Sequence, residues 1–261
     1  RMVDYATELA VCCKQLRISG DLAERALSTE GESHLDFLLN LLRDEVTARR
    51  EARIAKLIKT AGFPRLHSFE EFRPDQVEFN DTSLEELKQL QFYHEGKNLI
   101  MYGGTGTGKT MLSICIGLQA CREGYTVRFF RTARLINKLS EAQAKGRLDY
   151  FLNKLSKVQI LILDEFGYVP YDRNGSQLLF DYLCEQHEDS EKVIILNTNL
   201  EFSQWVNVLY SEKMAAALIG RLTHHCHLML FPGENNRLKE SSINELYRSI
   251  ALRNERESKP S

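Results

Sequence analysis

The sequence predicts an α/β protein: a small all-α N-terminal domain, then a three-layer domain built on a five-stranded parallel sheet. Over the first 62 residues the periodicity is helical. Further along, short apolar runs alternate with helical stretches, as in a parallel sheet covered on both faces. A glycine-rich loop of the phosphate-binding kind joins the first of these runs to a helix. The five expected strands are residues 99–102, 126–130, 160–163, 193–197 and 228–231.

Composition limits the classes of partner. The 261 residues carry a formal net charge of −2, so no global charge excess indicates nucleic acid or membrane. No apolar run approaches the ~20 residues that cross a bilayer, and the start lacks the pattern of a secretory signal. We therefore expect a cytoplasmic protein with no membrane partner. The six cysteines have no C-x-x-C spacing, so neither a zinc site nor a disulfide framework is indicated.

Residues 1–62 form the expected helical N-terminal domain. Leucines at loose helical spacing surround a break at Ser19 and Gly20, and a longer amphipathic helix follows. Cations gather near the end of this helix, where they are either a solvated face or a contact for phosphate groups. These cations are Arg49, Arg50, Arg53 and Lys56.

Residues 63–83 are expected to be an ordered linker. Gly62, Phe63 and Pro64 end the preceding helix. The polar segment that follows contains three more phenylalanines, at positions 69, 72 and 79. Such rings either pack against the next domain, residues 84–261, or cover a bound base.

The phosphate loop occupies residues 103–110, between an expected strand and an expected helix. Its glycines let successive backbone N–H groups point at phosphate oxygens, and the N-terminus of the next helix faces the same charge. Lys109 is expected to neutralise the β- and γ-phosphates of ATP, and the Thr110 hydroxyl to hold Mg²⁺. The expected nucleotide-binding residues are Gly103, Gly104, Thr105, Gly106, Thr107, Gly108, Lys109, Thr110 and Met111.

Two further strand ends carry side chains that suit ATP hydrolysis. Asp164 can reach the Mg²⁺ shell together with Thr110, and Glu165 can orient or deprotonate the attacking water. The next strand ends near Asn199, our first choice for an amide that positions water, with Asn197 as the second. Turn formation is the alternative interpretation of these asparagines.

Four runs resemble the insertion-sequence ATP-binding proteins of the IstB family and, as relatives, the DnaC helicase loaders. They are the phosphate loop and residues 163–170 (LDEFGYVP), 198–205 (TNLEFSQW) and 219–226 (IGRLTHHC). The second and third are far more specific than the general ATPase motifs. The resemblance covers nearly the whole chain and implies an AAA+ P-loop ATPase that hydrolyses ATP with Mg²⁺, stimulated by DNA and assembly.

The resemblance also implies roles for single residues. Asp164 and Glu165 would serve metal and water, alongside Lys109, with Asn199 as the first sensor and Arg221 as an arginine finger in a neighbour's ATP site. It implies no separate C-terminal lid, with Arg237 considered as a substitute for the lid arginine. After residue 234 we expect a polar turn, an amphipathic helix and a charged tail, the helix carrying Ile243, Leu246, Ile250 and Leu252.

The function implied is ATP-dependent regulation of DNA transposition in the bacterial cytoplasm, at the nucleoid when the protein is on DNA. The chain would form a homo-oligomer on duplex target DNA, recruit an IstA-like transposase and reset by hydrolysis. The alternatives are a DnaC-like loader that binds single-stranded DNA, a switch with little hydrolysis, and a small-molecule kinase. An extra helix after the second core strand would face DNA, with the cations Arg131, Arg134, Lys138, Lys145 and Arg147.

Overall fold

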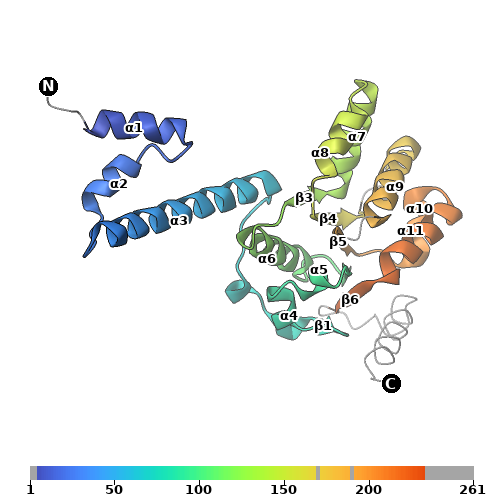
Figure 1. The fold of residues 1–261 in the computed structure, drawn as a ribbon. Helices are drawn as coiled ribbons and strands as arrows, with labels where there is room; N and C mark the ends of the chain where they lie inside the picture. The colour runs from blue at the N-terminus through green and yellow to red at the C-terminus, as the bar shows by residue number, and fades with distance from the viewer. Residues whose placement is uncertain (1–4, 169–170, 189–190, 233–261) are drawn as a thin grey trace, which may run out of the picture. The chain divides into compact units, whose positions relative to one another are not determined.

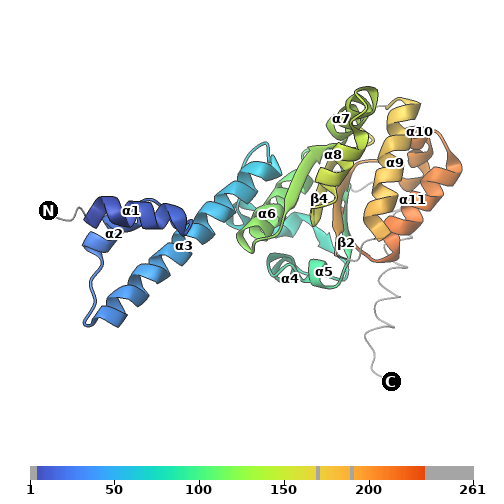
Figure 2. The ribbon, with the colours of Figure 1, turned by 45° about the horizontal axis from the view of Figure 1, so that its top comes forward.

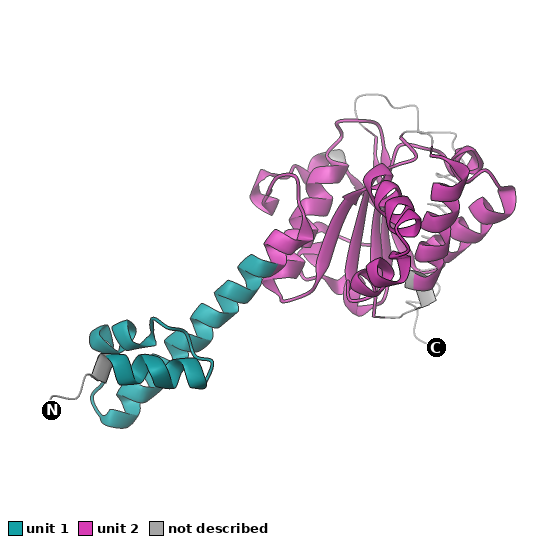
Figure 3. Ribbon diagram, turned by 90° about the horizontal axis from the view of Figure 1, so that it is seen from above, with its two compact units in different colours: residues 1–56 teal, residues 57–261 magenta. Residues whose placement is uncertain are grey.

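A computed structural model describes residues 5–168, 171–188 and 191–232. The chain divides into two compact units, residues 1–56 and residues 57–261 (Figure 3). The expected boundaries after residues 62 and 83 remain predictions. The expected C-terminal helix and Arg237 lie outside the described residues.

The first unit is helical, as predicted. Helices α1 (Tyr5–Gln15) and α2 (Leu22–Ser28) precede α3 (His34–Ala61), whose residues from Leu57 onward belong to the second unit. The predicted long helix is therefore confirmed. Its apolar stripe is largely exposed, however, at Leu35, Leu38, Leu39, Leu42 and Val46.

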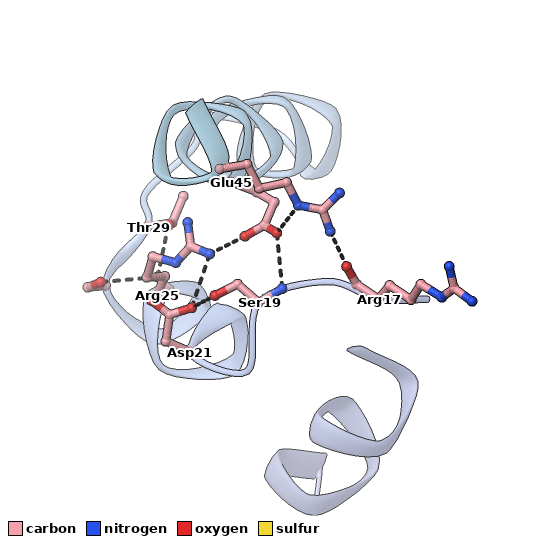
Figure 4. Close-up of polar contacts among 8 residues, drawn as sticks. Arg17, Ser19, Asp21, Arg25, Thr29 and Glu45 are labelled. Carbon is pink, nitrogen blue, oxygen red and sulfur yellow. Dashed lines mark hydrogen bonds and ion pairs between the residues drawn. The ribbon is translucent and has the colours of Figure 1, made fainter. Parts of the chain in front are cut away.

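A buried carboxylate organises the polar contacts of the first unit (Figure 4). Glu45 of α3 accepts hydrogen bonds from the Ser19 N–H at 3.0 Å and from Arg49 Nε at 2.7 Å, and it pairs with Arg25. The Ser19 N–H and the two guanidinium groups hold the pKa of Glu45 below its ordinary value, against the opposing effect of burial. These contacts fasten the turn before α2 to α3.

The second unit contains a six-stranded sheet in the order β1-β6-β2-β5-β4-β3. All five predicted strands are present and parallel, each within a few residues of its expected bounds. The two-residue strand β1 (Glu78–Phe79), which falls in the expected linker, adds an antiparallel edge beside β6. The parallel strands are β2 (Asn98–Gly103), β3 (Val127–Arg131), β4 (Ile160–Phe166), β5 (Val193–Thr198) and β6 (Cys226–Phe231).

Helices cover both faces of this sheet, which makes the three layers that the sequence predicts (Figures 1 and 2). One apolar cluster joins one face of the sheet to α4 (Leu84–Lys88), α5 (Gln91–His94) and α6 (Lys109–Arg122). A second cluster joins the other face to the remaining helices. These are α7 (Thr132–Ala144), α8 (Leu148–Leu155), α9 (Arg173–Glu188), α10 (Trp205–Leu209) and α11 (Glu212–His224).

The segment between α3 and α4 packs onto the sheet domain. It contains the short 3-10 helices η1 (Phe69–Glu71) and η2 (Pro74–Gln76) and then β1, while a third, η3 (Phe202–Gln204), follows β5. Phe72 is buried in the same apolar cluster as α6, and Phe63, Phe69 and Phe79 pack against that cluster. The phenylalanines therefore serve packing, the first of the two expected roles.

Within the described residues, no helix combines the length and the apolar character needed to cross a membrane.

The stretch expected to form one extra helix after β3 forms two helices, α7 and α8. Helix α7 buries Leu135, Ile136 and Leu139 against the core.

Candidate functional site

The phosphate loop joins the end of β2 to the first turn of α6, as predicted. Gly103 lies so close to β6 that a β-carbon there would sit 2.2 Å from the carbonyl oxygen of Phe231. Gly108 has φ +99°, in the left-handed region that favours glycine, and it caps α6. The loop therefore depends on both glycines, and the N–H groups that open α6 face the space it encloses.

Lys109 lies across this loop. Its Nζ donates to the carbonyl oxygens of Gly103 at 2.7 Å and Gly104 at 2.5 Å, and to Thr107 Oγ1 at 3.4 Å. Burial lowers the pKa of Lys109 to about 8, against the opposing pull of Asp164. Bound phosphate would raise this pKa again, because it favours the charged form of the amine.

Three elements meet at Asp164, which is buried at the carboxyl end of β4. Thr110 Oγ1 of α6 lies 2.9 and 3.1 Å from its two carboxylate oxygens. Asn197 Nδ2 of β5 donates to Asp164 Oδ1 at 2.9 Å, and Ser113 Oγ in turn donates to Asn197 Oδ1 at 2.9 Å. The structure thus brings together Thr110 and Asp164, the two predicted metal ligands.

These residues fit Mg²⁺, because a hydroxyl and a carboxylate are the hard oxygen donors that this ion prefers, with phosphate oxygens completing its shell. Thr110 and Asp164 would hold it beneath the loop. When bound, the ion supplies positive charge to the phosphate oxygens.

Glu165 takes an unusual backbone conformation. Its φ of +57° is rare for a residue other than glycine, and the pairing of β4 with β5 is irregular between Leu163 and Phe166. The half-exposed carboxylate lies 3.5 Å from Arg131 Nε at the end of β3. The backbone therefore turns Glu165 out of the sheet, and a cation from the set expected to bind DNA contacts it.

The two asparagine candidates lie in different places. Asn197 is buried against Asp164, whereas Asn199 is exposed beyond the end of β5. Strand β5 lies between β2, which leads into the phosphate loop, and β4, which carries Asp164 and Glu165. Asn199 remains the predicted sensor, and Asn197 is the amide that the structure ties to the acidic motif.

Arg221 lies in the last turns of α11, directly after Gly220. The helix continues because Gly220 costs only about 1 kcal/mol in a helix interior. The guanidinium group is half-buried, and Nη1 lies 2.6 Å from Cys184 Sγ of α9. The role of an arginine finger stays a prediction.

The expected DNA-binding cations differ in how they are held. In the first unit Arg49 is bound to Glu45 and to the carbonyl oxygen of Arg17, while Arg50, Arg53 and Lys56 are exposed. In the second unit Arg131 pairs with Glu165, and Lys145 pairs with Glu141. Arg134, Lys138 and Arg147 are exposed on or beside α7 and α8.

Sequence reasoning missed three contributors to the site: Ser113, Thr132 and the pairing of Arg131 with Glu165. Thr132 Oγ1 donates to the backbone carbonyl of Asp164 at 2.9 Å. Ser113 lies one helical turn beyond Lys109, a spacing that could have indicated a polar residue on the loop side of α6. Nothing in the sequence signals the other two, because they depend on the register of β3 against β4.

The family model and the similar relatives that comparison found point to the same family. The model of the family described as "IstB-like ATP binding protein" matches residues 14–244. The chain is 34% identical over 220 residues to an insertion sequence IS21 ATP-binding protein of Pseudomonas aeruginosa, covering 84% of this chain and 82% of that protein. An IS5376 ATP-binding protein of Geobacillus stearothermophilus is 32% identical over 225 residues, covering 86% and 88%.

Solved structures support the fold. DnaA from Aquifex aeolicus, bound to AMPPCP, matches with a TM-score of 0.53 and 20% identity, covering 76% of this chain and 56% of that chain. The DnaI structure matches with a TM-score of 0.51 and 18% identity, covering 70% and 93%. At these identities the likeness supports the fold alone and carries no residue roles.

Proposed function

Because the chain belongs to the family of IstB-like ATP-binding proteins, we propose that it is an ATPase that assembles on duplex DNA and regulates transposition there. ATP binding follows from the family. Hydrolysis, duplex DNA, self-assembly and recruitment of a transposase are the proposed parts. The relatives are named as insertion-sequence proteins, which supports the link to transposition.

The observation that carries this proposal is the cluster beneath the phosphate loop. Lys109, Thr110 and Asp164 lie where phosphate and Mg²⁺ would bind, and Glu165 stands beside them at the end of β4. Water would attack the γ-phosphorus while Glu165 accepts its proton, and ADP would leave with the pair of electrons from the broken P–O bond. This arrangement favours hydrolysis over a passive switch.

DNA would be coupled to this reaction through Arg131. Its guanidinium group contacts Glu165, and the same side chain belongs to the cationic region around α7. A DNA phosphate that drew Arg131 away would leave the Glu165 carboxylate free to act as a base. This coupling supports stimulation of the ATPase by DNA.

We expect duplex DNA to stimulate ATP turnover and to increase particle size in the presence of ATP. Both quantities are measured on the full chain, by phosphate release and by light scattering, with duplex and with single-stranded DNA. A constant monomer with unstimulated turnover would refute the proposal. Stimulation by single strands alone would favour a helicase loader of the DnaC kind.

We expect Arg221 to act on the ATP site of a neighbouring subunit. Arg221→Ala protein should hydrolyse ATP slowly, and an arginine supplied in trans contributes about 10³–10⁵ in rate in other P-loop enzymes. Mixing it with Lys109→Ala protein should restore part of the turnover, because some interfaces then combine an intact loop with an intact arginine. Mixtures that remain as inactive as the separate variants would count against a role in trans.

A further inference from the structure

At the amino-terminal end of β3, away from the phosphate loop, the second unit holds a cavity of about 380 Å³. Its walls are mostly apolar and come from three elements: Leu57 of α3, Val127 of β3, and Phe151 and Leu155 of α8. Val127 belongs to the apolar cluster on one face of the sheet and Leu155 to the cluster on the other. The cavity therefore opens at the sheet edge, where both parts of the core reach the surface.

Three cations border this apolar space: Arg128, Lys154 and Lys157. Arg128 donates to the carbonyl oxygen of Thr60, and its guanidinium carbon lies 5.5 Å from the centre of the Phe130 ring. Lys154 Nζ lies 4.4 Å from the centre of the Tyr150 ring. Aromatic rings and a backbone carbonyl thus hold two of the three cations in place.

No carboxylate within the described residues forms an ion pair with any of these three side chains. Their charge is therefore available to a partner. An apolar cavity ringed by cations complements a segment in which one large apolar side chain is flanked by carboxylates. A duplex would match the cations but not the apolar walls, because its phosphates have no apolar group to insert.

We propose that this cavity, hereafter the edge cavity, binds an acidic peptide segment of a partner protein through one aromatic or aliphatic anchor. The anchor lies against Phe151 and Leu155, and flanking carboxylates pair with Lys154, Lys157 and Arg128. The edge cavity contains no residue of the nucleotide site, so the inference does not rest on the proposed ATPase function.

The test measures binding of a short fluorescent peptide, one phenylalanine between glutamates, to the full chain by anisotropy, without nucleotide or DNA. Reversing two border charges, with Lys154→Glu and Lys157→Glu together, should weaken the affinity by about tenfold or more. Lys213→Glu, an exposed reversal on α11 outside the edge cavity, should leave the affinity unchanged. ATP turnover by the reversed protein should match the unaltered chain and so confirm that it is folded.

A second peptide separates the anchor from simple charge attraction. The peptide with serine in place of phenylalanine should bind the unaltered protein at least as weakly as the phenylalanine peptide binds the protein with both lysines reversed. Equal binding of the two peptides, or equal binding of the first peptide to normal and reversed protein, would overturn the proposal. It would also be overturned if the reversal reduced duplex DNA binding and left peptide binding intact.

Discussion

Lys109→Ala should abolish ATP binding at concentrations that saturate the unaltered protein. The ammonium group lies against the loop, on the carbonyl oxygens of Gly103 and Gly104. Charge-assisted hydrogen bonds from it to the β- and γ-phosphates would contribute about 1.5–3 kcal/mol each. Loss of two such bonds corresponds to a drop in affinity of roughly a hundredfold or more. Titration calorimetry measures it, with circular dichroism to show that the variant is folded.

The same amine gives ATP binding a pH dependence. Burial lowers the pKa of Lys109 to about 8, so the side chain is mostly neutral above that pH. Phosphate favours the charged form, so binding takes up a proton, and the affinity should fall as the pH rises through 8. Lys109→Ala protein should lack this dependence, and an affinity close to that of the unaltered chain would contradict the assignment.

Glu165→Gln should stop hydrolysis while ATP binding persists. The amide keeps the shape of the side chain but cannot accept a proton from water, and general-base catalysis typically contributes about 10²–10⁴ in rate. Because the bound ATP is not consumed, the variant should accumulate as a nucleotide-bound assembly on duplex DNA. Phosphate release and retention of DNA by the assembly are the two measurements.

A matched control is Glu185→Gln, an exposed glutamate of α9 that changes the net charge by the same amount. It should leave turnover and assembly as they are. Unchanged ATP turnover in Glu165→Gln would refute the assignment of Glu165 as the general base. Loss of ATP binding in that variant would point instead to a structural role in the turn after β4.

The sequence predicted the sheet because each strand is a short apolar run buried on both faces, as at Ile162 and Ile195. It also predicted that Thr110 and Asp164 would meet, since the carboxyl ends of all the parallel strands lie at one edge of the sheet, where β5 alone separates β2 from β4. Both inferences depend on patterns that are local in the chain.

Features that depend on strand register or on backbone strain could not be predicted from the sequence. Asn197 and Asn199 are two residues apart, so in a continuous strand both side chains would point to the same face of the sheet. They differ because β5 ends at Thr198, between them. The positive φ of Glu165 has no signature, because residues other than glycine seldom adopt it. The sequence predicts α3 as an amphipathic helix but not whether its apolar stripe is covered, and its own unit leaves the stripe largely exposed.

The position of β3 has a consequence for colloidal behaviour. Of the two edges of the described sheet, the one at β6 is covered by β1, whereas β3 pairs with β4 alone. Unpaired edge strands tend to join strands of other molecules, and charged side chains oppose this. Arg128 and Arg131 place two cations along this five-residue edge. At high protein concentration these arginines would oppose edge-to-edge pairing of β3 between copies of the protein.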